Sequence, residues 1–238
     1  MNQTVLVVAA HPDDEVLGCG ATIARHAANG DRVHILILAE GATSRRAQRD
    51  RGASKQALSR LGACAQRAGR ILGAKSVTLE DLPDNRLDSV DLLDIVKIVE
   101  RHVERLSPHT IYTHHSGDLN VDHRKVHEAV ATACRPLPGA AVRRLLSFEV
   151  PSSTEWQLPG SQPPFQPTCF VDASRTLALK LRALRAYAQE MRPFPHPRSL
   201  RAVEHLAKWR GASAGLAAAE AFIVAREIIA DASKRRSS

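Results

Sequence analysis

Two short clusters of acidic and histidine residues carry the chemistry that this 238-residue chain can offer. His11-Pro12-Asp13-Asp14 follows an apolar run at 5–9, and a second cluster from Asp118 to His123 follows the apolar run at 110–113. Each cluster precedes a segment with helical patterning, so each is expected at the carboxyl end of a strand, where open α/β sheets bind their ligands. We therefore predict that the two clusters form one site.

The donor atoms of these clusters suit a zinc ion. Zinc accepts neutral imidazole and carboxylate, and a catalytic zinc site keeps three protein ligands and a water molecule. His11 and Asp14 are three residues apart, which lets both side chains converge at the start of a helix, and His123 can supply the third ligand. Iron or another divalent ion accepts the same donors. Asp13 is then left beside the water and is predicted to be a general base.

Each of these residues has a structural interpretation when it is considered alone. Asp13 or Asp14 could cap the first helix, and Asp122 could cap the helix expected from residue 124. Otherwise Asp122 is expected to orient an imidazole or an amide beside the metal ligands. Asp118 is assigned either this role or a contact to the substrate. Two such clusters at two strand-to-helix junctions favour the metal site.

Predicted strands and helices alternate along the chain. This alternation predicts one α/β domain, Rossmann-like, with a mostly parallel sheet and helices on both faces. We expect this domain over 1–230 and a disordered basic tail over 231–238. Ser89 is the expected N-cap of the third helix, and Gly30 is expected to end the first. Strands are predicted at 5–9, 33–38, 76–79, 110–113, 144–150, 169–171 and the start of 220–229, and helices at 16–28, 55–72, 90–106, 124–133, 173–189 and 200–209.

Composition and charge exclude several classes of protein. No apolar stretch approaches the roughly 20 residues of a membrane helix, and no signal-peptide pattern opens the chain, so a cytoplasmic location is expected. The four cysteines lack CxxC spacing, which predicts free thiols. The net charge is +8, but only 4% of residues are aromatic and no nucleic-acid-binding motif occurs, so a nucleic-acid partner is not expected. The basic segment 40–52 is interpreted as a solvated loop or as a holder of substrate phosphate.

The segments Ala10-His-Pro-Asp-Asp-Glu15 and Asp118-Leu-Asn-Val-Asp-His123 resemble the PIG-L/LmbE-like N-deacetylases. The resemblance extends over almost the whole chain, with further matches at 82–88, 191–199, 208–211 and 219–222. It implies a zinc-dependent, Rossmann-like enzyme that removes an acetyl group from an N-acetylglucosamine-type sugar, free or linked to a nucleotide or lipid. It also leaves assembly into a homo-oligomer open.

The resemblance implies roles for individual residues. By position, His11, Asp14 and His123 correspond to the zinc ligands and Asp13 to the general base. Many relatives carry a histidine three residues before the last ligand, where it polarises the acyl oxygen, and this chain has Asn120 there. The nearby candidates for that role are His114, His115 and His196. Substrate contacts are expected from Arg45, Arg60 (one residue from the family's position), Asp88, Asp118 and Arg192.

Other functions remain open at this point. A nucleotide-binding module without catalysis would need a glycine-rich turn at the first junction, but His-Pro-Asp-Asp stands there and its carboxylates repel phosphate. Among enzymes, an amidohydrolase that acts on a thiol conjugate or an antibiotic intermediate uses the same site chemistry. The requirement for a metal and the identity of the released acid separate these classes.

Overall fold

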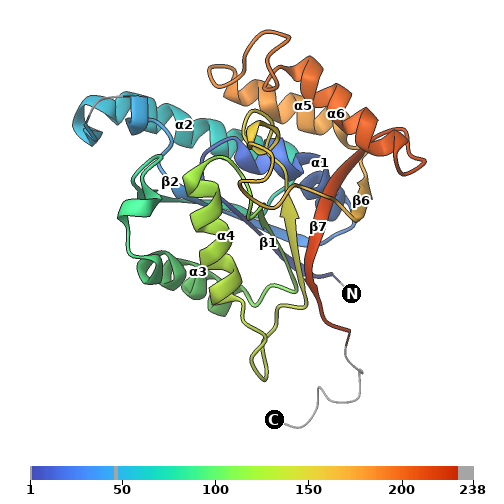
Figure 1. The fold of residues 1–238 in the computed structure, drawn as a ribbon, viewed down its shortest axis with the longest axis horizontal. Coiled ribbons are helices and arrows are strands. Elements are labelled where there is room, and N and C mark those ends of the chain that lie inside the picture. Colours follow the sequence, from blue (N-terminus) through green and yellow to red (C-terminus); the bar gives the residue numbers. More distant parts are fainter. Residues whose placement is uncertain (1, 46–47, 230–238) are drawn as a thin grey trace.

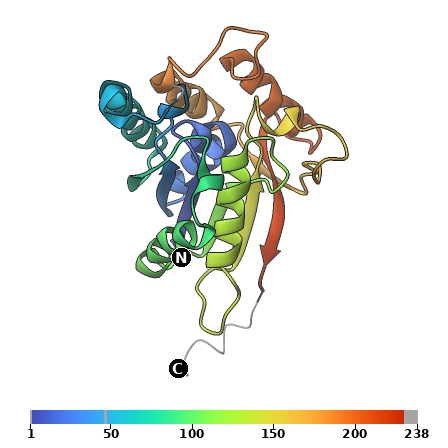
Figure 2. The same cartoon turned by 60° about the vertical axis from the view of Figure 1, so that its left-hand side comes forward.

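The computed structural model describes residues 2–45 and 48–229, with only the backbone described for Arg45. A twisted sheet lies between two layers of helices (Figure 1, and turned by 60° in Figure 2). The elements in chain order are β1 Thr4–Ala9, α1 Asp14–Ala28, β2 Arg32–Ala39, η1 Thr43–Arg45, α2 Arg51–Leu72, β3 Ser76–Leu82, η2 Leu87–Ser89, α3 Leu92–Leu106, β4 Thr110–His114, α4 Val121–Ala133, β5 Arg144–Phe148, η3 Thr154–Trp156, β6 Cys169–Asp172, α5 Leu177–Leu184, η4 Arg185–Tyr187, α6 Leu200–Ala212 and β7 Ala219–Glu227.

The strand order places the two acidic-histidine clusters side by side. The described strands form one seven-stranded sheet in the order β3-β2-β1-β4-β5-β7-β6. Strands β1 to β5 are parallel, and β7 is antiparallel to both of its neighbours. The chain leaves β1 toward β2 and β3 and then crosses back to β4, so the order reverses between β1 and β4. Ligands of open α/β sheets bind at such a reversal, and both clusters follow these two strands.

The alternation of side chains along β1 divides the core into two layers. Val5 and Val7 pack against α1, α2 and α5 on one face of the sheet. Leu6 and Val8 pack against α3 and α4 on the other. Because both faces of β1 are covered, all its side chains are buried, which explains a continuous apolar run in place of alternation. The predicted α/β class with helices on both faces is confirmed.

Several element boundaries differ from the sequence prediction. Helix α3 begins at Leu92 and not at residue 90, because Ser89 lies in the η2 turn and donates its hydroxyl to the carbonyl of Arg86. The predicted helix 173–189 is shortened to α5 and η4, since Asp172 accepts hydrogen bonds from the amide and hydroxyl of Ser174. Helix α2 begins at Arg51, within the segment that was expected to be a loop.

Other local predictions are confirmed. Gly30 follows the end of α1 with a positive φ of 86°. The last described strand, β7, extends the strand that was expected at the start of 220–229. All four cysteines are free. Among the described residues no helix combines the length and apolar character that a membrane span requires. The predicted tail 231–238 lies outside the described residues.

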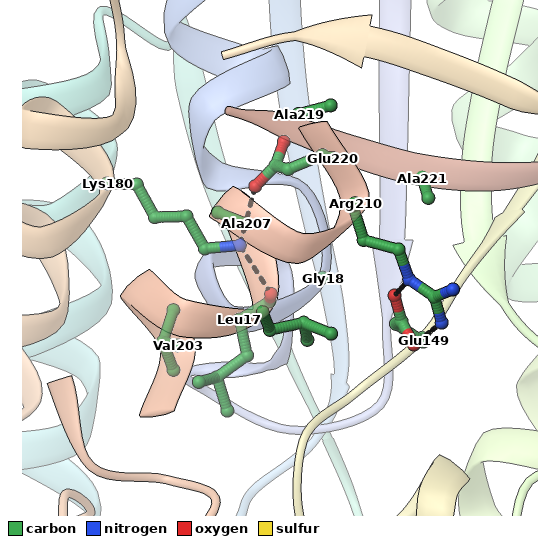
Figure 3. A pocket seen from close by; sticks show the side chains of 11 residues that line it. Leu17, Gly18, Glu149, Lys180, Val203, Ala207, Arg210, Ala219, Glu220 and Ala221 are labelled. Atoms are coloured by element: carbon green, nitrogen blue, oxygen red, sulfur yellow. Dashed lines mark hydrogen bonds and ion pairs between the residues drawn. The ribbon is translucent and has the colours of Figure 1, made fainter. Parts of the chain in front are cut away.

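Helix α1 is interrupted, and a buried ion pair joins its two parts (Figure 3). At Cys19 the backbone leaves the helical region (φ −145°, ψ 27°). Glu220 of β7 accepts a hydrogen bond from the N–H of Thr22 at 2.7 Å and another from the preceding residue at 3.0 Å. Lys180 of α5 donates to the carbonyl of Leu17 at 2.7 Å and to Glu220 at 2.6 Å. The pair therefore satisfies the backbone groups that the break exposes.

Close packing under the first turn of α1 accompanies this break. The ring of Phe148 occupies the space that a Cβ atom at Gly18 would need, so no larger residue fits there. The same ring lies 4.8 Å from the imidazole of His114. The packing of α1 against β5 is thus continuous with the packing behind the two acidic-histidine clusters.

Candidate active site

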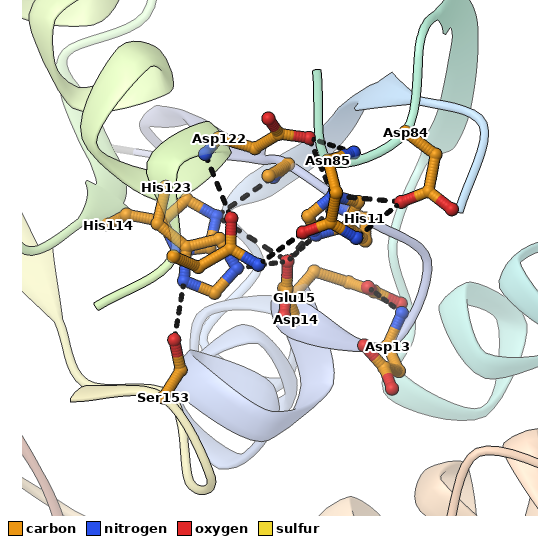
Figure 4. Close-up of polar contacts among 12 residues, drawn as sticks. His11, Asp13, Asp14, Glu15, Asp84, Asn85, His114, Asp122, His123 and Ser153 are labelled. Atoms are coloured by element: carbon orange, nitrogen blue, oxygen red, sulfur yellow. Dashed lines mark hydrogen bonds and ion pairs between the residues drawn. The ribbon is translucent and has the colours of Figure 1, made fainter. Parts of the chain in front are cut away.

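His11, Asp14 and His123 meet at the carboxyl ends of β1 and β4 (Figure 4). One carboxylate oxygen of Asp14 lies 3.2 Å from Nδ1 of His11 and 3.1 Å from Nε2 of His123. One possible ligand atom from each residue lies within 4.8 Å of the others. The predicted convergence of residues that are more than a hundred positions apart in the chain is therefore present in the structure.

A carboxylate holds the second nitrogen of each imidazole. Nε2 of His11 lies 2.9 Å from Asp122, and Nδ1 of His123 lies 3.0 Å from Asp118. Metal-binding histidines usually have such a partner, which fixes the ring orientation and makes the ligand more basic. Asp122 does not cap α4, since Asn120 caps it by accepting a hydrogen bond from the Asp122 amide. The structure thus places Asp122 where the orienting role requires it.

Asp118 is fully buried, and other protein groups occupy its oxygens. They accept hydrogen bonds from the hydroxyls of Ser153 and Thr154 and from the backbone amide of Asn120. The loop at 150–156 is thereby tied to the side chain that orients His123. These contacts contradict the predicted substrate contact at Asp118, because a sugar hydroxyl cannot reach a carboxylate that is enclosed in this way.

Asp13 lies beside the cluster in an unusual backbone conformation. Its φ is 115°, a region that costs a non-glycine residue free energy and is found mostly at functional sites. The carboxylate of Glu15 accepts a hydrogen bond from the Asp13 amide at 3.0 Å and another from the hydroxyl of Tyr187 at 2.6 Å. The Asp13 carboxylate accepts a hydrogen bond from Nη1 of Arg198 at 3.0 Å. Contacts from the C-terminal third of the chain therefore hold Asp13 in this conformation.

The site carries more buried negative charge than its neighbouring cations balance. Five aspartates in it are each at most 3% exposed, namely Asp13, Asp14, Asp84, Asp118 and Asp122. Arg198 forms an ion pair with Asp13, and the remaining partners in the site are imidazoles. Buried carboxylates are costly unless they are paired or coordinate a metal. The excess charge thus favours a divalent cation.

The pKa values within the site follow from this charge balance. Burial lowers the pKa of His123, but Asp14 and Asp118 outweigh burial and raise it to about 9. Burial also lowers the pKa of His11, which hydrogen bonds to Asp122 and Asp14 raise well above its ordinary value. Burial raises the pKa of Asp13 to about 8, although Arg198 opposes this shift. In the protein alone, protons on the imidazoles balance part of the charge that a metal ion would balance.

Two groups of side chains have a spacing that suits a metal ion, and the first is favoured. In the group His11, Asp14 and His123, the other oxygen of Asp14, Oδ1, is buried without a hydrogen-bond partner, and Nε2 of His123 forms no hydrogen bond although it lies 3.1 Å from Oδ2 of Asp14. In the second, His11 with Asp84 and Asp122, N–H or hydroxyl groups of the protein already occupy the carboxylate oxygens. Unpaired donor atoms are what a bound ion would use, so the predicted ligand set fits.

The structure places several predicted substrate and catalytic residues away from this cluster. The imidazole of His115 bonds to the carbonyl of Pro163 and packs on Phe165, so it anchors the proline-rich loop. Arg60 lies on the exposed surface of α2. Arg192 is exposed and donates to carbonyls of its own loop. These contacts do not support the roles predicted for His115, Arg60 and Arg192, which stay untested.

Other predicted residues lie nearer to the site. Asn120 donates from its amide nitrogen to Asn85, and His196 accepts a hydrogen bond from the amide of Arg198. Asp88 is exposed on the η2 turn, which follows the loop that contacts His11. The side chain of Arg45 lies outside the described residues. Asn120, His196 and Asp88 therefore remain candidates for contacts to a substrate.

The basic segment 40–52 is neither a free loop nor an open phosphate site in its described part. Arg49 and Arg51 lie 2.8 and 2.9 Å from the carboxylate of Glu40, and Arg51 lies 2.6 Å from Asp81. Glu40 is buried, and the two arginines hold its pKa below the ordinary value. Because these cations have partners, they do not provide the predicted phosphate contacts.

Sequence analysis missed three contributors to the site. Arg198 stands in the proline-rich segment 191–198, where the prediction chose Arg192 instead. Asp84 and Asn85 follow β3, and their segment was recognised only for Asp88. Because β3 ends at the same edge of the sheet as β1, a Pro-Asp-Asn sequence after it was the available signal. Nothing in the sequence distinguishes Arg198 from Arg192, the other arginine of 191–198.

His114 supports the site from behind. Its imidazole stacks on His123 with ring centroids 3.9 Å apart, and its Nε2 accepts a hydrogen bond from the amide of Ala10 at 2.8 Å. Burial and the neighbouring His123 lower the pKa of His114 well below its ordinary value. A neutral His114 behind His123 thus fixes the end of β1 through the amide of Ala10.

Comparison with known proteins identifies the family. The sequence profile of the PIG-L family, described as GlcNAc-PI de-N-acetylase, matches residues 6–134, more than half of the chain. The chain therefore belongs to the PIG-L family of N-deacetylases. The matched region contains all three candidate metal ligands and Asp13, whereas Arg198, Lys180 and Glu220 lie beyond it.

Individual proteins are similar in sequence or in fold. The uncharacterized deacetylase YaiS of Escherichia coli K12 is 29% identical over 154 residues, which is 63% of this chain and 75% of YaiS. The N,N'-diacetylchitobiose deacetylase of Pyrococcus horikoshii shares the fold with a TM-score of 0.74 at 17% identity, covering 94% of this chain and 84% of that one. The 4-carboxy-2-hydroxymuconate hydratase GalB of Pseudomonas putida KT2440 has a TM-score of 0.75 at 20% identity, covering 96% and 98%.

Proposed function

We propose that this protein is a zinc-dependent hydrolase that removes the N-acetyl group of an amino sugar, of N-acetylglucosamine type, free or linked to a nucleotide or lipid. One observation carries the proposal: two oriented imidazoles and Asp14 converge on one point, while Asp13 stands beside them, held by Arg198. The similar fold of a hydratase means that the fold alone supports no particular reaction. The side chains of the site therefore support the proposed reaction.

His11, Asp14 and His123 would hold the metal, with Asp122 and Asp118 fixing the two rings. Zinc bound there would polarise the amide carbonyl and lower the pKa of a bound water to about 7. Fe²⁺ or another divalent ion meets the same donors. The loop contacts to Asp118 and Asp122 keep the donor atoms in place before a metal arrives, which reduces the ordering that binding requires.

Asp13 would move the proton in this reaction. Its carboxylate takes a proton from the attacking water and passes it to the leaving amine as the C–N bond breaks. Arg198 keeps this carboxylate oriented, and the guanidinium opposes the rise in pKa that burial causes. A divalent cation held by the neighbouring ligands would lower the pKa of Asp13 further, as the role of a base requires. Asn120 is the proposed donor to the acyl oxygen, and His196 is the alternative.

The substrate would be a small molecule and not a nucleic acid. Two similarities support the proposed sugar substrate. The family profile is described as a GlcNAc-PI de-N-acetylase, and a protein with the same fold is an N,N'-diacetylchitobiose deacetylase. An amide on a thiol conjugate or an antibiotic intermediate is the alternative, because the site chemistry is the same. The cytoplasmic location and assembly into a homo-oligomer stay predictions.

The test is a screen for acetate release. Purified protein is loaded with zinc and incubated with N-acetylglucosamine in free, nucleotide-linked and lipid-linked forms and with an N-acetylated thiol conjugate. We expect acetate from at least one amino sugar, loss of this activity with a chelator and recovery with added zinc. Asp13→Asn protein with normal zinc content is the control for contaminating enzymes.

Two results would overturn the proposal. Zinc-loaded protein that releases no acetate from any amino sugar but cleaves the thiol conjugate would favour the alternative amidohydrolase. Acetate release that is unaffected by the chelator, from protein shown to be free of metal, would remove the metal from the mechanism.

A further inference from the structure

A polar cavity lies at the opposite edge of the sheet from the candidate active site. Its volume is about 420 Å³, and its lining residues come from the amino ends of β1 and β2, the residue before β3 and the end of α3. They are Thr4, Arg32, His34, Lys75, Arg105 and Leu106. We propose that this cavity binds the phosphate or diphosphate group of a small molecule. The inference does not depend on the proposed deacetylation.

The packing of the sheet explains why basic side chains gather here. Alternate residues of a strand point to the same face, so Arg32 and His34 share the face of β2 that carries Leu36 and Leu38. Those two leucines belong to the core under α3 and α4. Helix α3 ends at Leu106, above the start of the strands. Where this apolar layer ends, the face continues with cationic side chains.

The cations of this cavity have few partners. Arg32 donates to the hydroxyl of Thr4 at 2.9 Å, and Nη2 of Arg105 lies 2.9 Å from a nitrogen of His102. None of the six lining residues is acidic. Among the residues that the structure describes, no ion pair to a carboxylate involves Arg32, Lys75 or Arg105. The cavity thus carries unbalanced positive charge.

The neighbouring carboxylates face other groups. Asp31 precedes Arg32 in sequence, but its oxygens accept a hydrogen bond from the amide of Gln3 and pair with His26 at 2.7 Å. Glu80 lies 3.3 Å from the far nitrogen of His102. Neither carboxylate lines the cavity, so an anion entering it would meet cations without competition from a lining acid.

The pKa of His34 depends on the positive charge of this cavity. Burial and then the nearby charges of Arg32, Arg105 and Lys75 lower the pKa of His34. Its Nδ1 lies 2.8 Å from the hydroxyl of Ser76, which fixes the ring. A bound anion would offset the like charges around the ring. The imidazole is therefore a built-in reporter for ligand binding.

The chemistry of the cations indicates the ligand. Guanidinium groups bind phosphate oxygens through two parallel hydrogen bonds, and a lysine adds a point charge. The volume is within the range of about 300–1,000 Å³ that small-molecule sites occupy. A single phosphate group, or two joined, on a small molecule therefore suits the cavity, whereas a nucleic acid would need a longer basic surface.

The test measures binding of inorganic diphosphate to the full chain by calorimetry, with the ring signals of His34 followed by NMR. We expect saturable binding and a shift of the His34 signals. Arg32→Gln/Arg105→Gln should weaken binding at least about tenfold, because each lost charge-assisted contact is worth that much. Lys75→Gln, which lies outside helices and strands, should also weaken binding without disturbing folding. Unchanged melting temperatures establish that the variants are folded.

The matched control removes the same charge elsewhere. Arg182 and Arg185 are exposed on and after α5, far along the chain from the cavity residues. Arg182→Gln/Arg185→Gln should leave diphosphate binding unchanged. Equal weakening in both double variants would overturn the proposal in favour of general attraction to a basic protein. Absence of saturable binding to diphosphate and to vesicles would also overturn it.

A second arm distinguishes the source of the phosphate. Vesicles that contain phosphatidic acid are sedimented with the wild-type chain and with both double variants. Sedimentation that is lost only in Arg32→Gln/Arg105→Gln, without binding of free diphosphate, would support a lipid headgroup as the source. Binding of free diphosphate without sedimentation would support a soluble phosphate compound.

Discussion

The two strand-to-helix junctions of the site provide similar side chains by different structural means. The β4–α4 junction is regular, and Asn120 caps the helix from within the cluster itself. The β1–α1 junction contains a left-handed Asp13 and leads into a helix that is broken at Cys19. Glu220 and Lys180 support that helix from the C-terminal third of the chain. The junction that contains Asp13, the proposed base, is thus the one that depends on contacts from distant parts of the chain.

The two junctions therefore have different roles in the proposed reaction. The β4–α4 junction provides one imidazole and the two carboxylates that orient the rings, all within a short segment. The β1–α1 junction provides His11, Asp13 and Asp14, and Asp13 must face the reacting groups from a backbone conformation that costs free energy. Substitutions at the first junction and its supports should therefore affect chemistry more than substitutions at the second. The following experiments test this comparison, beginning with the largest expected effect.

Asp14→Ala should abolish both zinc binding at this site and acetate release. Asp14 lies between the two imidazoles, so its removal leaves two ligands, fewer than a catalytic zinc site needs. The zinc content of the purified protein, measured against the wild type, checks this. Full zinc content would contradict the ligand assignment.

Asp13→Asn should lower kcat by about 10²–10⁴-fold, the usual contribution of a general base. The zinc content should stay unchanged, because Asp13 lies outside the ligand set. Kinetics of the zinc-loaded variant measure the effect. Turnover close to that of the wild type would exclude Asp13 as the base.

Glu220→Gln should lower the free energy of unfolding by about 3–5 kcal/mol, since it leaves Lys180 buried without its anion. The control is Glu204→Gln, which breaks the exposed pair with Lys208 on α6 and should cost less than about 1 kcal/mol. Denaturant unfolding measures both variants. Equal small losses would mean that the ion pair does not support α1.

Arg198→Gln should lower kcat by about 10- to 100-fold, because a hydrogen bond to a charged group is worth about 1.5–3 kcal/mol. Zinc content and KM should change little. Arg192→Gln in the same loop removes the same charge from an exposed position and should have no effect. Recovery of Arg198→Ala activity by added guanidinium would distinguish a role at Asp13 from loop stability.

Asp122→Asn should weaken zinc binding by about 10- to 100-fold through a misoriented His11. Competition with a metal indicator measures the affinity. Asp88→Asn, on the exposed η2 turn, is the control and should leave zinc affinity unchanged. An unaltered affinity in Asp122→Asn would mean that the backbone alone fixes the ring.

The features of the fold that were predicted correctly depend on residues close together in the sequence. The apolar run of β1 follows from burial on both faces, and Gly30 ends α1 because glycine accepts a positive φ. Boundaries were missed where side chains bonded to nearby backbone, as Ser89 and Asp172 do. Such competition is decided by small free-energy differences that the residue type alone does not reveal.

The amino-acid sequence by itself determined which helices and strands form. It also determined that His11, Asp14 and His123 follow two of the strands, because periodicity and the chemistry of donor atoms are local properties. Tertiary structure alone decided that Arg198 and not Arg192 reaches Asp13, and that His115 turns toward Pro163. It also decided that Glu220 and Lys180 join the two parts of α1. These contacts depend on how distant segments pack, and no spacing within one segment encodes the direction in which a side chain meets another.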